Sequence, residues 1–137
     1  MSNGSLFALQ LAEFARKAGK NADLVVQKVT VDILARVVKR SPVDTGRFRA
    51  NWQVSVGTPA SGNLAVEDKN GDSTVRAGTS AMTGFQVGPS VFIVNNLPYG
   101  PRLEYEGWSK QAPAGMVRIT VAEYQSLIEK AVGEVKQ

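Results

Sequence analysis

The chain has neither cysteine nor histidine among its 137 residues. Without cysteine it has no disulfides, thiolate nucleophiles or cysteine-ligated zinc, and without histidine it lacks the commonest metal ligand and general base. Acidic residues do not fill the gap, because Glu104 and Glu106, two positions apart, form no convincing pair for general acid–base chemistry. We therefore expect no enzyme activity, no cofactor and no metal site, and we interpret Glu104 as part of a solvated or interface segment.

Long apolar runs are absent as well. No stretch approaches the roughly 20 apolar residues that span a bilayer, and the first residues contain no basic region followed by an apolar one. We expect neither a membrane segment nor a secretory signal. The length and the 43% apolar content fit one globular domain that covers residues 1–137.

The charge is mild but unevenly placed. The net charge is +4, from 16 basic and 12 acidic residues, and the segment 39–49 holds Lys39, Arg40, Arg47 and Arg49 with one acid. One interpretation is a helix end with basic residues near its carbonyls, followed by a solvated strand face. The other is a basic surface that faces phosphate or an acidic partner.

Apolar spacing predicts helices near both ends of the chain. Apolar residues recur every three or four positions over 6–18 and again up to Arg40, with a break and a helix cap expected near 21–23. Residues 1–20 are candidates for an N-terminal arm that clasps a neighbouring subunit. Near the C-terminus, Thr120 and Glu123 have the spacing of a capping box, which predicts a helix after Thr120. Residues 116–119 are a short strand or an added turn of that helix.

A tight turn, which we call the corner, follows the main helix. Pro42 forbids the helix to continue, Asp44 and Thr45 favour a turn, and Gly46 can adopt a positive φ. From residue 47 to 56 apolar and polar residues alternate, which predicts a strand that carries Trp52.

Residues 58–84 are polar and contain Asn70-Gly71, a strong hairpin signal. We expect a flexible polar hairpin that projects from the body. The pattern Asp68-x-Asn70-x-Asp72 also resembles the start of a calcium loop, but the glycine and glutamate required later in such a loop are replaced by Ser73 and Thr79.

The second half adds a strand and an aromatic cluster. Residues 85–95 predict a buried strand antiparallel to the Trp52 strand, and a turn at 98–101 precedes a short helix or turn at 102–106. The aromatic residues that follow either plug the end of the sheet or anchor an interface. The fold class is therefore α+β, with a long N-terminal helix and a C-terminal helix packed on a small, mainly antiparallel sheet.

Three motifs carry a resemblance to a known family. SPVDTGRFRANW at 41–52, VNNLPYGPRLEYEGWSKQAP at 94–113 and AGMVRITVAEY at 114–124 resemble the neck proteins of long-tailed bacteriophages, which are called head–tail connector, head–tail joining or tail-completion proteins. The resemblance implies a fold similar to tail terminators and a ring, expected to be a hexamer, between the head connector and the tail tube. It assigns the turn and the second patch as candidate contacts. The candidate turn and interface residues are Asp44, Thr45, Gly46, Arg47, Arg49, Trp52, Asn96, Pro98, Tyr99, Leu103, Glu104, Tyr105 and Trp108.

The function that we expect is structural. A neck subunit completes the tail and joins it to the DNA-filled head, with head-completion or connector proteins on one side and the tail tube or terminator on the other. It is found in the virion, and in the host cytoplasm during assembly, while DNA passes through the ring without specific binding. The alternative is a small nucleic-acid-binding module that uses the basic segment 39–49, whose affinity would fall steeply with salt.

Overall fold

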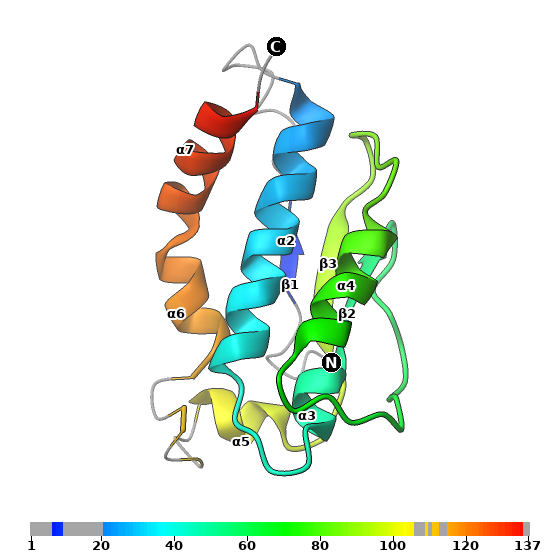
Figure 1. The fold of residues 1–137 in the computed structure, drawn as a ribbon, viewed down its shortest axis with the longest axis vertical. Coiled ribbons are helices and arrows are strands. Elements are labelled where there is room, and N and C mark those ends of the chain that lie inside the picture. The colour runs from blue at the N-terminus through cyan, green and yellow to red at the C-terminus, as the bar shows by residue number, and fades with distance from the viewer. Residues whose placement is uncertain (1–6, 10–20, 106–108, 110, 113–114, 136–137) are drawn as a thin grey trace.

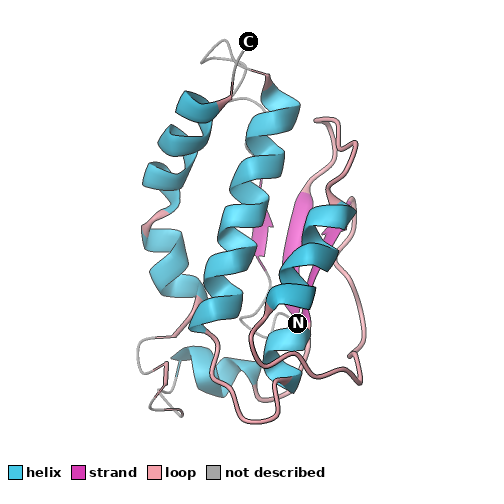
Figure 2. Ribbon diagram, in the orientation of Figure 1, coloured by secondary structure: helices cyan, strands magenta, loops and turns pink. Residues whose placement is uncertain are grey.

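Helices cover one face of a small antiparallel sheet in the computed structural model, which describes residues 7–9, 21–105, 109, 111–112 and 115–135 (Figures 1 and 2). The α+β class is confirmed. Among the described residues the sheet has three strands in the order β1-β3-β2, with β3 in the centre. The elements are β1 (Phe7–Leu9), α2 (Ala22–Arg40), α3 (Arg47–Ala50), β2 (Trp52–Val56), α4 (Asp72–Ala81), β3 (Val91–Asn95), α5 (Gly100–Tyr105), α6 (Val117–Ala122) and α7 (Tyr124–Glu134).

Helix α2 is the central helix, with α7 on one side and α4 on the other (Figure 1). It begins where the sequence predicts, because the side chain of Asn21 accepts a hydrogen bond from the N–H of Leu24 at 3.3 Å. It ends at Arg40, since Ser41 before Pro42 is extended. Its buried apolar side chains are Val25, Val26, Val29, Ile33, Leu34, Val37 and Val38.

The predicted antiparallel pairing of the Trp52 strand with the strand in residues 85–95 is confirmed. Strands β2 and β3 are antiparallel, and Trp52 lies opposite Asn95. Strand β1 pairs with the other edge of β3, with Phe7 opposite Ile93. The helix predicted for 6–18 is therefore wrong at Phe7–Leu9, because backbone pairing with β3 outweighs the local helical spacing. The rest of that prediction lies outside the described residues.

The predicted strand begins five residues later than expected. Arg47–Ala50 form the short helix α3, and only Trp52–Val56 are a strand. The amide of Ala50 donates to the carbonyl of Gly46 at 3.0 Å, which closes a helical turn instead of a ladder. A helical turn and a strand both place residues four apart on one side, so Phe48 and Trp52 are buried, as either pattern requires.

The projecting hairpin is wrong. The chain turns at Gly71, with a φ of 83°, and then forms α4, which packs on α2 and β2. A carboxylate oxygen of Asp68 accepts hydrogen bonds from the N–H and the hydroxyl of Thr74, which satisfies a free donor in the first turn of α4. Gly78 lies directly against Leu34 of α2, and a Cβ at this position would come 2.0 Å from a Leu34 methyl group. Part of the supposed excursion is thus core.

The C-terminal helix is also displaced from its prediction. Residues 116–119 belong to an added helical turn, since α6 begins at Val117, and Thr120 lies inside α6 instead of capping it. The Thr120 hydroxyl donates to the carbonyl of Met116 at 2.7 Å and accepts from Arg40 at 2.9 Å. Glu123 stands at the junction of α6 and α7 and pairs with Arg40, so it does not close a capping box.

Candidate functional site

The corner that follows α2 is held tightly at its inner end. The Ser41 hydroxyl donates to the carbonyl of Val37 at 2.6 Å and accepts from the indole N–H of Trp52 at 2.8 Å. Trp52 is 3% exposed. Of the candidate interface residues, Trp52 is therefore a core residue that fixes the corner to the sheet.

The tip of the corner is built around Gly46, which has the positive φ that the sequence predicts, at 92°. The hydroxyl of Thr45 accepts from the N–H of Arg47 at 3.2 Å, and both side chains, like that of Asp44, are exposed. The carbonyl of Gly46 accepts from the N–H of Asp68 at 3.0 Å. A Cβ on Gly46 would lie 2.6 Å from the backbone nitrogen of Lys69, so both conformation and close approach require glycine here.

The corner and the second motif share a surface hollow of about 400 Å³. Phe48, Tyr99 and Leu103 give it apolar walls, and Tyr99 packs against Phe48 with ring centroids 5.6 Å apart. The side-chain amide of Gln111 binds both backbone groups of Val43, at 2.9 and 3.1 Å, and so fastens the second motif to the corner. We call this hollow the corner pocket. It is lined by Pro42, Val43, Asp44, Thr45, Gly46, Arg47, Phe48, Tyr99, Leu103, Ser109 and Gln111.

Glu104 lies away from solvent, contrary to the solvated or interface segment that we predict. It is 1% exposed, and its carboxylate accepts the backbone N–H groups of Met116 and Val117 at 2.8 Å and of Arg118 at 2.9 Å. The Arg118 guanidinium adds an ion pair at 3.1 Å. A carboxylate at these otherwise unsatisfied amides stabilises the start of α6 through both hydrogen bonding and the helix dipole. Glu104 is therefore a structural residue.

The remaining candidates of the second motif are divided between surface and support. Asn96 donates to the carbonyls of Ala60 and Gly62, at 2.9 and 3.2 Å, so it holds the loop after β2. Pro98 and Tyr105 are exposed, and the Arg118 guanidinium lies 5.1 Å from the centre of the Tyr105 ring. Trp108 lies outside the described residues.

A second pair of hydrogen bonds fixes the same loop. The buried side chain of Asn51 binds both the N–H and the carbonyl of Leu64, at 2.7 and 3.0 Å. Leu64 and Val66 are nonetheless 40% and 53% exposed. Sequence reasoning missed this arrangement, since no local pattern links Asn51 to a backbone thirteen residues later.

The basic segment does not form a patch of four free cations. The Arg49 guanidinium donates to the carbonyls of Lys39, Ser41 and Lys69. Lys39 itself donates to the carbonyl of Asn70 at 2.7 Å. Arg40 pairs with Glu123 on α6–α7, which leaves the exposed Arg47 as the one cation of the four whose side chain bonds to nothing in the described part of the chain. The interpretation of these residues as a helix-end cluster agrees better with the geometry.

Two carboxyl groups have lowered pKa values. The hydrogen bond from Arg40 lowers the pKa of Glu123, and the positive charges of Arg40 and Arg36 add to the effect. Burial pushes the pKa of Asp68 up, but the hydrogen bonds from Thr74 outweigh it and leave that pKa below its usual value. Both groups are structural carboxylates, one at the α6–α7 junction and one at the start of α4.

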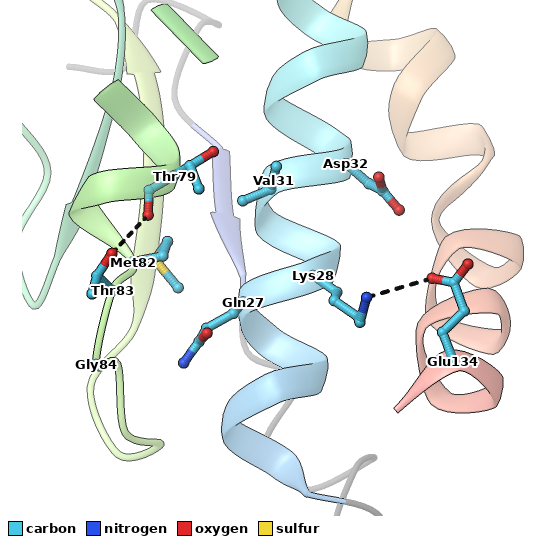
Figure 3. Close-up of a pocket in the computed structure, with 9 residues that line it drawn as sticks. All are labelled: Gln27, Lys28, Val31, Asp32, Thr79, Met82, Thr83, Gly84 and Glu134. Atoms are coloured by element: carbon cyan, nitrogen blue, oxygen red, sulfur yellow. Dashed lines mark hydrogen bonds and ion pairs between the residues drawn. The ribbon is translucent and has the colours of Figure 1, made fainter. Parts of the chain in front are cut away.

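A second hollow lies over α2 on the helical side of the molecule, with residues of α4 at one side and Glu134 of α7 at the other, and has a volume of about 420 Å³ (Figure 3). On the α7 side Lys28 and Glu134 form an ion pair at 3.9 Å, and on the α4 side the Thr83 hydroxyl donates to the carbonyl of Thr79. Among the described residues no cluster of three or more acidic side chains is placed to hold a metal ion. Within the same ranges, no helix combines the length and apolar content that crossing a bilayer requires.

Comparison with known protein families identifies a family for this chain. The family model described as "Bacteriophage HK97-gp10, putative tail-component" matches residues 7–105, which include the corner, the sheet and α5. No curated protein and no solved structure matches the chain.

Proposed function

The chain belongs to the HK97-gp10-like family of bacteriophage tail components, and from this premise we propose that it is a neck subunit. It completes the tail and joins it to the DNA-filled head, as one member of a closed ring, and the resemblance of its motifs implies six copies. Its role is surface complementarity without a chemical reaction. Its neighbours are head-completion or connector proteins, and the tail tube or terminator.

The observation that carries the proposal is the corner pocket. Two motifs separated by more than forty residues of sequence, each similar to neck proteins, supply its walls, and the side-chain amide of Gln111 ties them together. An apolar hollow with aromatic walls is suited to receive a side chain from another protein. Arg47 at its rim offers a positive charge for an acidic neighbour.

The second support is the sheet. Its two outer strands, β1 and β2, each pair with β3 on one side. Open strand edges favour association with further chains, and contacts between unlike surfaces of identical copies close into rings when the rotation permits. A small α+β domain with two edges is thus suited to a ring.

The first test of the proposal is the number of subunits in the assembled particle, measured by its mass. Light scattering or native mass spectrometry of the purified protein, alone and then with tail tubes, should give a discrete multiple of the subunit mass in at least the second condition. Arg47→Glu should lower tail binding or infectious-particle yield while the melting temperature stays unchanged. Arg76→Glu is the matched control, because Arg76 is an exposed arginine on α4 away from the corner pocket. A monomer under both conditions, with full activity of the Arg47 variant, would overturn the proposal.

DNA binding separates the proposal from the alternative nucleic-acid module. Because three of the four cations of segment 39–49 are bonded within the fold, we expect only weak retention of duplex DNA, with a dissociation constant of about 10⁻⁴ to 10⁻⁶ M at physiological salt. The opposite result would be nanomolar, sequence-dependent binding that survives about 200 mM salt and disappears in Arg47→Glu. It would replace the neck function with the nucleic-acid one.

A further inference from the structure

In the described sheet, strand β1 is hydrogen-bonded to a single neighbouring strand. Its three residues, Phe7–Leu9, pair with β3 and with no other strand of the described sheet. On β3, Val91 lies opposite Leu9 and Ile93 lies opposite Phe7, and with β1 in place both β3 residues are 0% exposed. Any strand with the sequence of β1 would satisfy the same N–H and C=O groups, whether it belongs to the same copy or to another.

The helix that follows β1 in the chain does not need it. Helix α2 has its own cap at Asn21, and the carboxylate of Asp23 in its first turn accepts the N–H of Val87 at 2.8 Å. The first turn of α2 is thus anchored to the β3 side of the domain by contacts that do not involve residues 7–9. Strand β1 can leave its own β3 without unwinding α2.

The connection is long enough to reach a neighbour. Residues 10–20 lie between β1 and the cap of α2. Twelve steps from Leu9 to Asn21 span at most about 40 Å when extended. A compact domain of this length has a radius of gyration of about 14 Å, and hence a diameter of about 36 Å. The chain can therefore carry β1 to the equivalent edge of an adjacent copy.

We propose that in the assembled ring β1 of each copy pairs with β3 of the next copy, so that neighbours exchange their N-terminal strands. The proposal rests on the ring described above and names the segment that closes it. Exchange keeps every bond of the β1–β3 ladder, so it costs little, and in a closed ring each edge that is vacated is filled again. Once the subunits are held side by side, the neighbouring edge is present at a high effective concentration.

The absence of cysteine makes the proposal directly testable. Ala8 on β1 and Ser55 on β2 lie opposite Phe92, on its two sides in the sheet. Directly opposed residues of antiparallel strands have Cα atoms roughly 4.5 to 5.5 Å apart, a separation that a disulfide spans. A cysteine at Phe92 can thus report on either neighbour, and the Ser55 pair is a control that lies within one copy whatever β1 does.

The experiment mixes two single-cysteine proteins. Chains with Ala8→Cys and chains with Phe92→Cys are combined before ring assembly, oxidised with copper–phenanthroline and separated without reductant. Strand exchange should give disulfide-linked dimers at up to about a quarter of the interfaces, the share that random mixing in a closed ring allows. The mixture of Ser55→Cys and Phe92→Cys chains should give no dimer.

Chains that carry both Ala8→Cys and Phe92→Cys provide the second arm. With exchange, the oxidised ring runs as a ladder of covalent multimers, and the Ser55→Cys/Phe92→Cys chain runs as a cross-linked monomer. Rings of confirmed mass that give only a cross-linked monomer in both double variants would overturn strand exchange and leave the proposed neck function standing. Failure of the uncross-linked protein to form a ring, by mass, would instead refute the ring on which both proposals depend.

Discussion

Replacing Glu104 by glutamine tests whether this residue supports the fold or contacts a partner. Glutamine keeps the shape of the side chain but turns one acceptor oxygen into an NH₂ donor. That donor would face either the amides of Met116 and Val117 or the N–H groups of Arg118. Hydrogen bonds to a charged acceptor contribute about 1.5–3 kcal/mol each, but the Arg118 side chain is half-exposed, so its ion pair is screened and counts for little.

We expect Glu104→Gln to lower the free energy of unfolding by about 2 kcal/mol, because the start of α6 loses its charged cap. For a domain of this size the melting temperature should fall by roughly 6–10 °C. Circular dichroism melting and urea unfolding measure both quantities. Tyr105→Ala is the control, since the neighbouring Tyr105 is 56% exposed and should change stability by less than about 1 kcal/mol. A Glu104→Gln protein that melts like the wild type but fails to assemble would refute the structural role and restore the interface role.

Three further outcomes are expected. Gly46→Ala should cost about 1–3 kcal/mol from the positive φ alone, and more from contact with the backbone of Lys69, so a melting temperature equal to wild type would contradict the described corner. Thr30→Val should stabilise the protein by about 1 kcal/mol in urea unfolding, because the buried Thr30 hydroxyl has no hydrogen-bond partner in the described part of the chain, whereas a loss of stability would reveal one. Arg40 lowers the pKa of Glu123 in the folded protein. The stabilising effect of Glu123 is therefore complete above the pKa of the unfolded chain, near 4.5, and is lost as the pH falls through the lower pKa of the folded state. Glu123→Gln should therefore flatten the loss of stability below about pH 5 relative to wild type.

The sequence predicts those parts of the fold that local chemistry decides. The bounds of α2 follow from apolar spacing, the Asn21 cap and Pro42, and the positive φ of Gly46 follows from the turn that must succeed them. The alternating residues of β2 and the apolar run of β3 predict their pairing. In each case the pattern that supports the prediction lies within a short stretch of sequence, even where the two strands that pair, β2 and β3, are far apart in the chain.

The errors lie where distant contacts decide. Asn70-Gly71 suits a hairpin or the entry to a helix equally well, and the fit of Gly78 against Leu34, forty-four positions away, favours the helix. The role of Glu104 depends on amides that follow it by twelve to fourteen residues. Of the candidate site, the corner and the second motif do converge on one hollow, but Trp52, Arg49 and Glu104 support it from inside and do not present a contact surface.

Hydrogen bonds from Asn51 fix the backbone of the loop after β2 independently of the side chains that the loop carries. On this loop Asn51 binds the backbone of Leu64, and Asn96 binds the carbonyls of Ala60 and Gly62, so residues from other parts of the chain hold the course of the loop. The exposed side chains of Leu64 and Val66 take no part in these hydrogen bonds, so we expect their replacement to leave the backbone at Leu64 in place. A tail protein built in this way can change the exposed side chains of a loop while its fold stays the same.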